Sequence, residues 1–366
     1  MRYPRLDVLR AAAIFAVFWH HVVYHVLLQR GLSGPASYGV WTLPTETESP
    51  SAWCSFFLSQ YGGWGVMLFF VISGFCIHLS FLKWQASPSA SGFWRPYFIR
   101  RFFRIYPPYL FALILACIPP LLAGAWPDGF QVWSHVFMVH NLHADTLFGI
   151  NPSFWSLAVE WQLYLVYPFF LLFCRLWGLT KFLGVVLAID LFLRAWTQGW
   201  PGSGGLLLSQ LPFSYWLTWG AGAWCAERVW SRQPLWPYES SVAALLIFAA
   251  VVVKICMPLA WLSVPLASIG FALWCDVYAR RTDALTLAER AAVPLGLVSY
   301  SFYLIHQPLI VQLAPRLEVR LFHGDIFLTL TLGGLLMFVI IYLLSALMCR
   351  FVERPSSEAG HRLARS

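Results

Sequence analysis

Long apolar stretches alternate with short polar ones along almost the whole chain. Ten of the apolar stretches are long enough to span the roughly 30 Å hydrocarbon core of a bilayer. This pattern predicts an all-α, polytopic membrane protein with about ten transmembrane helices in a single domain over residues 1–366. The ten predicted spans are 8–28, 61–82, 105–124, 155–175, 179–197, 207–229, 240–256, 260–280, 292–315 and 326–350.

The segments between the spans also have distinct compositions. The first span is longer than the apolar core of a signal peptide and no small-residue cleavage site follows it, so we interpret it as a true span. No internal repeat is evident, which argues against a transporter built from inverted halves. We predict an outside loop at 30–60, a cytoplasmic basic interfacial segment at 88–104, an outside re-entrant or interfacial segment at 128–150, and a cytoplasmic tail at 351–366.

The basic residues indicate how the helices are oriented. An even number of spans puts both termini on one side, and that side holds nineteen of the 24 lysines and arginines. Cytoplasmic loops of membrane proteins are enriched in Lys and Arg, so we predict that both termini are cytoplasmic. The same asymmetry explains the formal net charge of +8 without nucleic acid as a partner.

Overall composition supports a membrane protein and excludes an ordinary soluble domain. Hydrophobic residues make up 59% of the chain and charged residues only 11%, against roughly 25% charged residues in soluble domains. The 8 cysteines show no metal-ligand spacing. We interpret them as small buried hydrophobic residues, and no metal is expected.

The first span, LDVLRAAAIFAVFWHHVVYH, carries ionisable residues that are costly in hydrocarbon. Arg10 and His21 are separated by ten residues, which leaves only about 20° between their side chains on an α-helix. Tyr24 and His25 extend this polar stripe, whereas His20 points about 100° away from it. The stripe predicts a functional site. The alternative is that Arg10 is an anchor paired with a nearby acid and that the histidines are core residues.

Two other predicted spans carry polar residues at a similar depth. Glu160 lies seven residues after Ser153, where the chain enters the fourth span from outside, and His21 lies seven residues before the end of the first span. Both are therefore about 10 Å below the outer boundary, and we predict a His21–Glu160 pair that orients the imidazole. His306 lies in the outer half of the ninth span, with Ser299 and Tyr303 one or two turns below it. A lock between helices is the alternative for Glu160, and a structural hydrogen-bond network is the alternative for His306.

The remaining charged and aromatic residues leave two interpretations open. Arg100, Arg101 and Arg104 could bind phosphates, because guanidinium binds them bidentately, or could simply be positive-inside anchors. Trp155 is one of several outer tryptophans that suit either an interfacial belt or a sugar-stacking platform. Three acid–base neighbours are predicted to be structural ion pairs: Asp190–Arg194, Asp276–Arg280 and Glu353–Arg354.

The chain resembles the acyltransferase-3 membrane family. Arg10, ten intervening residues and His21 match the family's R-x10-H signature. Further motifs appear in the family's order between residues 6 and 355. They are GVMLFFVISGFCI (65–77), FIRRFFRIYPPYL (98–110), PSFWSLAVEWQLYLVYP (152–168), SYSFYLIHQPL (299–309) and FVERP (351–355).

This resemblance implies an acyl-CoA-dependent O-acyltransferase of the bacterial cytoplasmic membrane. It implies transfer of an acyl group, usually acetyl, from acetyl-CoA or another cytoplasmic acyl-CoA to a hydroxyl of a carbohydrate or glycolipid at or beyond the outer face. His21 would be the catalytic residue and Arg10 its partner in the signature. Arg101 and Arg104 would handle the donor, and Glu160 would be the acid of the fourth-span motif.

The residues together predict a mechanism with two variants. CoA phosphates bind Arg100, Arg101 and Arg104, and His21 acts as general base or carries the acyl group transiently. A proton-coupled transporter or flippase, with the histidines as a relay, is the competing class, and a scaffold protein is a third. We expect the following residues to contact the acceptor or to support the catalytic histidine: His25, Tyr24, His306, Tyr303, Ser299 and Trp155.

Overall fold

A computed structural model of the chain describes residues 3–29, 61–87, 92–197, 203–233 and 239–365. The predicted outside loop at 30–60 and the first four residues of the predicted segment 88–104 lie outside the described residues. Within the described residues the regular structure is entirely helical, which confirms the all-α class.

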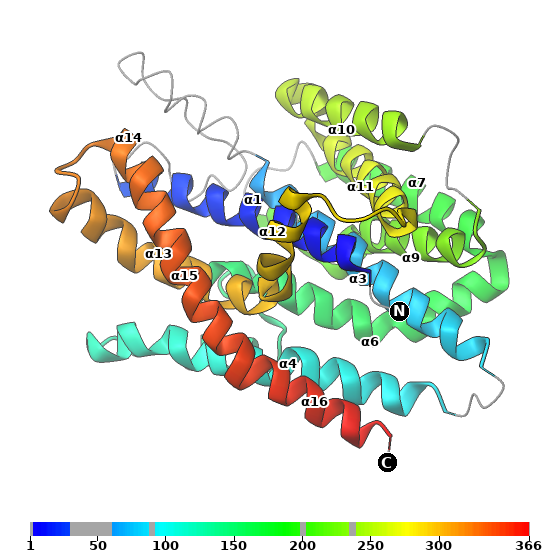
Figure 1. Cartoon of the computed structure of the whole chain (residues 1–366), viewed down its shortest axis with the longest axis horizontal. Helices are drawn as coiled ribbons and strands as arrows, with labels where there is room; N and C mark the ends of the chain where they lie inside the picture. The colour runs from blue at the N-terminus through cyan, green and yellow to red at the C-terminus, as the bar shows by residue number, and fades with distance from the viewer. Residues whose placement is uncertain (1–2, 30–60, 88–91, 198–202, 234–238, 366) are drawn as a thin grey trace.

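Long helices follow one another through the chain and build one bundle (Figure 1). The main helices are α1 (Pro4–Gln29), α3 (Gly62–Gln85), α4 (Trp94–Leu122), α6 (Trp155–Trp177), α7 (Leu179–Thr197), α9 (Trp216–Trp230), α10 (Glu239–Ile255), α11 (Ser263–Arg280), α13 (Ser299–Arg320) and α15 (Gly334–Met348). The shorter helical pieces are α5 (Gly129–Val136), η1 (His140–Leu142), η2 (Pro152–Phe154), α8 (Ser203–Ser209), η3 (Pro212–Tyr215), η4 (Met257–Leu262), α12 (Leu287–Leu297), α14 (Ile326–Leu328), η5 (Thr329–Gly333), η6 (Cys349–Glu353) and α16 (Arg354–Leu363).

Each of the ten predicted spans overlaps one of these long helices, but only six helical segments of the described chain are long and apolar enough to cross a membrane. Helix α10 is apolar but shorter. The number ten therefore stays a prediction, as does the cytoplasmic side of the termini, although both chain ends lie toward the same end of the bundle (Figure 1). The six segments are Pro4–Leu28, Gly62–Gln85, Trp94–Leu122, Pro152–Trp177, Pro258–Arg280 and Ile326–Leu363.

The structure corrects two predicted boundaries. The basic segment before residue 105 and the span after it form one continuous helix, α4, which has Pro107 and Pro108 in its interior. Prolines are tolerated in this way when neighbouring groups satisfy the freed backbone carbonyls. The predicted span 292–315 is instead two helices, α12 and α13, with a turn at Val298.

The predicted segment 128–150 forms α5, η1 and several turns. Asp128 caps α5, because its side chain accepts a hydrogen bond from the Phe130 N–H at 3.0 Å. Asn151 starts the next helical run in the same way. The position of this segment relative to a membrane stays a prediction.

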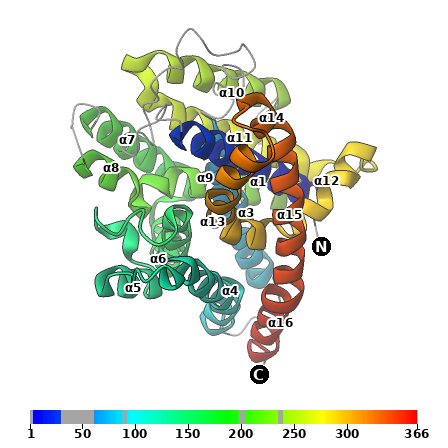
Figure 2. The ribbon, with the colours of Figure 1, turned by 90° about the vertical axis from the view of Figure 1, so that its left-hand side faces the viewer.

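Helices α1 and α3 lie in the middle of the bundle, with α13 and α15 on one side and α9, α10 and α11 on another (Figure 2). Glycines allow α3 to approach its neighbours closely. A Cβ on Gly65 would lie 2.4 Å from the Ala13 carbonyl oxygen of α1, and one on Gly222 of α9 would lie 1.9 Å from the Val71 carbonyl oxygen of α3. These two contacts fix α3 between α1 and α9.

Two of the three predicted structural ion pairs are confirmed. Arg194 contacts Asp190 at 2.8 Å, and Arg280 contacts Asp276 at 2.6 Å. The third prediction is wrong, because Glu353 accepts a hydrogen bond from Ser301 at 2.7 Å and pairs with Arg104 at 3.5 Å instead of Arg354. The cysteines of the described chain are free thiols.

Candidate functional site

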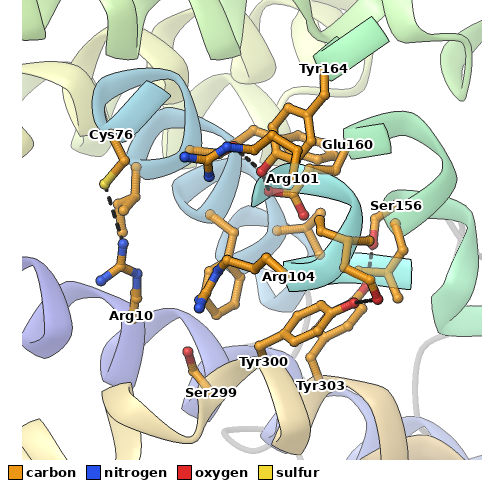
Figure 3. A pocket seen from close by; sticks show the side chains of 17 residues that line it. Arg10, Cys76, Arg101, Arg104, Ser156, Glu160, Tyr164, Ser299, Tyr300 and Tyr303 are labelled. Carbon is orange, nitrogen blue, oxygen red and sulfur yellow. Dashed lines mark hydrogen bonds between the residues drawn. The ribbon is translucent and has the colours of Figure 1, made fainter. Parts of the chain in front are cut away.

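A polar cavity of about 110 Å³ lies between α1, α3, α4, α6 and α13. Three arginines point toward it from two helices, so we call it the arginine cavity (Figure 3). Its polar lining residues are Arg10, Ser73, Cys76, Arg101, Arg104, Ser156, Glu160, Tyr164, Ser299, Tyr300 and Tyr303.

Arg10 enters the arginine cavity from α1 and is held by two groups. Its Nη1 donates to Asp7 at 2.7 Å, and its Nη2 donates to the Cys76 sulfur of α3 at 3.3 Å. The pairing of Arg10 with Asp7 therefore exists, but the guanidinium also lines a cavity (Figure 3). A purely structural anchor does not require that position.

Arg101 and Arg104 enter the same cavity from α4. The Arg101 guanidinium lies over the rings of Tyr97 and Tyr164, at 6.0 and 5.7 Å from their centroids. Its Nε is buried without a hydrogen-bond partner among the described residues. Arg104 is held more loosely, with half its side chain exposed and Glu353 at 3.5 Å.

Arg100 does not line the arginine cavity, although the sequence grouped it with its two neighbours. Consecutive residues on an α-helix point about 100° apart. The face of α4 that turns Arg101 and Arg104 inward therefore turns Arg100 away from them.

Glu160 belongs to the arginine cavity and is not paired with His21. It accepts a hydrogen bond from the Tyr164 hydroxyl, which also contacts Ser73 at 2.9 Å. The predicted His21–Glu160 pair is thus absent from the described structure. Equal depth in a membrane does not determine which way a helix face points, and this face of α6 is directed toward α3 and α4.

A second cavity, of about 300 Å³, has a different lining. It carries two histidines and several aromatic rings, so we call it the histidine cavity. Its lining residues come mainly from α1, α3, the start of α6 and the segment around η3. They are Val17, His20, His21, Gly62, Gly63, Trp64, Val66, Met67, Phe148, Pro152, Ser153, Trp155, Arg194, Ser209, Gln210, Tyr215, Lys254, Ser263, Val264 and Tyr303.

His21 is oriented by His306 and by its own helix. His306 Nδ1 lies 2.7 Å from the Tyr303 carbonyl oxygen, which can only accept, so this nitrogen carries the hydrogen. In the neutral ring His306 Nε2 is then an acceptor, and it lies 3.1 Å from His21 Nδ1. His21 Nδ1 also lies 2.9 Å from the Val17 carbonyl oxygen. The partners thus assign the hydrogen of His21 to Nδ1 and leave the lone pair on Nε2.

His25 and Tyr24 lie behind His21 and do not line the histidine cavity. His25 accepts a hydrogen bond from the Gln307 amide at 3.3 Å, and its ring stands 6.4 Å from that of His21. Tyr24 packs against His25 and His20. Of the two predicted roles for His25 and Tyr24, support of the catalytic histidine fits this position better than contact with the acceptor.

The two cavities share Tyr303 and Val66 in their walls. The Tyr303 hydroxyl donates to the Ser153 carbonyl oxygen at 2.9 Å and contacts the Ser156 hydroxyl at 2.6 Å. Its ring lies 5.3 Å from the His306 ring. Tyr303 therefore forms part of the partition between the arginines and His21.

The sequence analysis identified Glu160 but missed several other residues of the site. Ser156 and Tyr164 lie four residues before and after Glu160 on α6, so one polar stripe at helical spacing carries all three. That signal was available. Glu353 and Gln307 had no such signal, because each acts on a residue far away in the sequence.

Three or more metal-ligating side chains do not come together anywhere in the described part of the chain.

Comparison with known proteins gives two matches. Residues 3–350 match the family model of an acyltransferase domain. The chain is 27% identical over 209 residues to the peptidoglycan O-acetyltransferase OatA of Listeria monocytogenes. The aligned region covers 53% of this chain and 28% of that protein. The chain thus aligns with less than a third of that relative. No solved structure matches it.

Proposed function

The chain belongs to the acyltransferase-3 family, and from this premise we propose that it transfers an acyl group, acetyl in the first instance, from acyl-CoA to a carbohydrate hydroxyl. The acceptor is a glycan or glycolipid at the outer face of the bacterial cytoplasmic membrane. The name of the Listeria relative supports an O-linked acetyl group and a glycan acceptor.

The arginine cavity is the proposed donor site. CoA carries phosphates, and Arg101 and Arg104 offer guanidinium groups at the cavity wall. Arg100 adds positive charge nearby on α4 but contacts the donor only outside the cavity. Arg10 and Cys76 lie farther along the same cavity, where the pantetheine arm would pass (Figure 3).

His21 is the proposed catalytic residue. Its Nε2 removes the proton of the acceptor hydroxyl while the oxygen attacks the thioester carbonyl; CoA leaves as a thiolate and takes that proton from His21. In the second variant, Nε2 attacks the thioester first and displaces CoA as a thiolate; the hydroxyl then attacks the acyl-imidazole, which frees Nε2, and the hydroxyl proton passes to the thiolate. Both variants need a lone pair on Nε2, which the hydrogen bonds of Nδ1 supply.

His306 takes the orienting role that the sequence analysis assigned to Glu160. It accepts the Nδ1 hydrogen of His21 and so maintains the required tautomer. Glu160 is proposed instead to position Tyr164 beside Arg101 in the donor site.

One observation carries the proposal: α1 places Arg10 in one cavity and His21 in the other, and the two cavities share Tyr303. A donor held by the arginines and an acceptor held near His21 would meet at this residue. Ser299 lines the donor side and Trp155 the acceptor side.

The test is thiol release by the purified protein in detergent, with acetyl-CoA, succinyl-CoA or a longer acyl-CoA and a glycan acceptor. Release of CoA thiol together with acetylated glycan is expected. Labelled acetyl-CoA without acceptor separates the variants, because only the second leaves label on the protein. Absence of thiol release with every donor would contradict the proposal and favour the transporter class.

A further inference from the structure

A third cavity, of about 600 Å³, lies beside the histidine cavity. It is lined by aromatic and aliphatic side chains of α6, α7 and α9, among them Phe173, Val186, Ile189 and Trp216. We call it the α7 cavity. Its lining is almost wholly apolar except near one end, where Asp190 and Arg194 lie.

The α7 cavity adjoins the histidine cavity at that polar end. Arg194 and Ser209 line both cavities. Two comparable apolar cavities, of about 340 and 330 Å³, share no lining residue with the histidine cavity. Contact with ordinary membrane lipid would not distinguish these three cavities, but only the α7 cavity shares lining residues with the cavity that holds His21.

Arg194 is suited to bind an anion at this junction. Its Nε donates to both Asp190 oxygens, at 2.9 and 2.8 Å, and its Nη2 donates to the Ser214 carbonyl oxygen at 3.0 Å. Its Nη1 makes no hydrogen bond with the described residues, and the side chain is 17% exposed. The ion pair fixes the guanidinium and leaves donors for a phosphate oxygen.

Aromatic residues lie on the other side of the junction. Trp155 and Tyr215 line the histidine cavity and pack against each other at 5.7 Å. A ligand whose phosphate contacts Arg194 would thus have the apolar α7 cavity on one side of the phosphate. On the other side it would have the histidine cavity, with the aromatic rings of Trp155 and Tyr215 and with His21.

We propose that the α7 cavity binds the lipid chain of a lipid-linked glycan, with the connecting phosphate at Arg194 and the sugar at Trp155. The inference rests on the proposed function and narrows its acceptor to a single apolar chain joined to a sugar through phosphate. A bilayer phospholipid lacks the sugar hydroxyl that must reach His21.

The first test is photo-crosslinking of the full-length protein with a diazirine-bearing farnesyl phosphate joined to N-acetylglucosamine. Label is expected on α7 and α9. The variant Ile189→Trp puts a larger side chain into the cavity and should reduce labelling about tenfold, which corresponds to about 1.4 kcal/mol. Leu347→Trp is the matched control, because Leu347 and Ile189 are both 53% exposed. Leu347 lines an apolar cavity that shares no lining residue with the histidine cavity.

The second test removes the anion site. The double variant Asp190→Asn, Arg194→Gln eliminates both charges together, so no unpaired acid is left to destabilise the fold. The double variant should be labelled less than the wild type. With the wild type, unlabelled farnesol should compete less well than the unlabelled phosphate-linked sugar.

Three outcomes would overturn the inference: equal labelling of Ile189→Trp and Leu347→Trp, unchanged labelling of the double variant, or full competition by phosphatidylglycerol. Labelling does not require turnover, so the two proposals fail separately. Thiol release without selective labelling contradicts the lipid site alone. Selective labelling without thiol release contradicts acyl transfer and leaves the lipid site standing.

Discussion

The arginine cavity and the histidine cavity share Tyr303 and each take a side chain from α1, yet they hold polar groups in different ways. In the first, two of the three arginines are paired with acids: Arg10 with Asp7, and Arg104 with Glu353. In the second, His21 is held by a neutral partner, His306, and by a backbone carbonyl.

This difference indicates two kinds of chemistry a short distance apart. Guanidinium groups fixed by acids bind anions and stay charged. An imidazole fixed by neutral partners keeps one lone pair and exchanges a proton. If the proposed division is right, substitutions in the first cavity change donor binding and substitutions in the second change the chemical step.

The largest expected effect separates the two histidines of the second cavity. His21→Ala should lower turnover by roughly 10²–10⁴-fold, the usual contribution of a general base. Acyl-CoA affinity, measured by calorimetry, should not change. His20→Ala is the control, because His20 lines the same cavity. Full activity in His21→Ala would rule out its role, and lost donor binding would contradict the separation of the cavities.

The next effect lies in the arginine cavity. Arg101→Gln should raise the KM for acyl-CoA by about 10–100-fold, because a hydrogen bond to a charged group contributes roughly 1.5–3 kcal/mol, while kcat changes less. Arg95→Gln is the control, since Arg95 is exposed on the same helix. An equal rise in the control would mean that overall charge, and not the cavity, binds the donor. Arg100→Gln should resemble the control.

Tyr303 tests the boundary itself. Tyr303→Ala should enlarge the passage and raise the rate with butyryl-CoA relative to acetyl-CoA by about tenfold, since each methylene in a pocket is worth roughly 1–3 kcal/mol. Tyr303→Phe keeps the ring and loses the hydroxyl contacts with Ser153 and Ser156. It should retain the wild-type preference. An unchanged preference in both variants would show that Tyr303 does not separate donor from acceptor.

A change in stability tests the close packing of α3, a helix that lines both cavities. Gly222→Ala should destabilise the protein by about 1–3 kcal/mol through overpacking, because its Cβ would lie 1.9 Å from the Val71 carbonyl oxygen. Thermal unfolding in detergent measures this change. Gly184→Ala is the control, because a Cβ there meets nothing within 4 Å. Equal unfolding temperatures for the two variants would contradict the close approach of α3 and α9.

The smallest expected effect comes from a histidine pair between the spans, which provides a structural contrast to His21. The rings of His135 and His140 stack at 4.0 Å. Burial lowers the pKa of His135 to about 4 and that of His140 to about 3.

The unfolded chain has histidine pKa values near 6.5. It therefore binds more protons than the folded protein below that pH, and stability should fall as pH decreases from about 6.5 to about 3. In His140→Phe the decrease in Tm between pH 7 and pH 5 should be smaller, with acyl transfer retained. A loss of transfer in this variant would place the pair in the active machinery.

Much of the fold could be predicted from local sequence. Apolar length predicted the helices, but two boundaries differed: α4 begins before residue 105 and continues through Pro107 and Pro108, and the chain turns at Val298 between α12 and α13. The α6 stripe of Ser156, Glu160 and Tyr164 was equally readable. Its partners on α3 and α4 were not, because nothing in a helix's own pattern states which neighbour its polar face will meet.

By itself, the sequence determined which residues share a helix face. Arg10 and His21 lie on one side of α1 because the spacing of an α-helix is a local property. Only the tertiary structure decided that Arg10 and His21 enter different cavities and that Tyr303 stands between these cavities. It also decided that His306, and not Glu160, faces His21. Those relations depend on how each helix is rotated against its neighbours, and distant contacts such as Gly65 against Ala13 set that rotation.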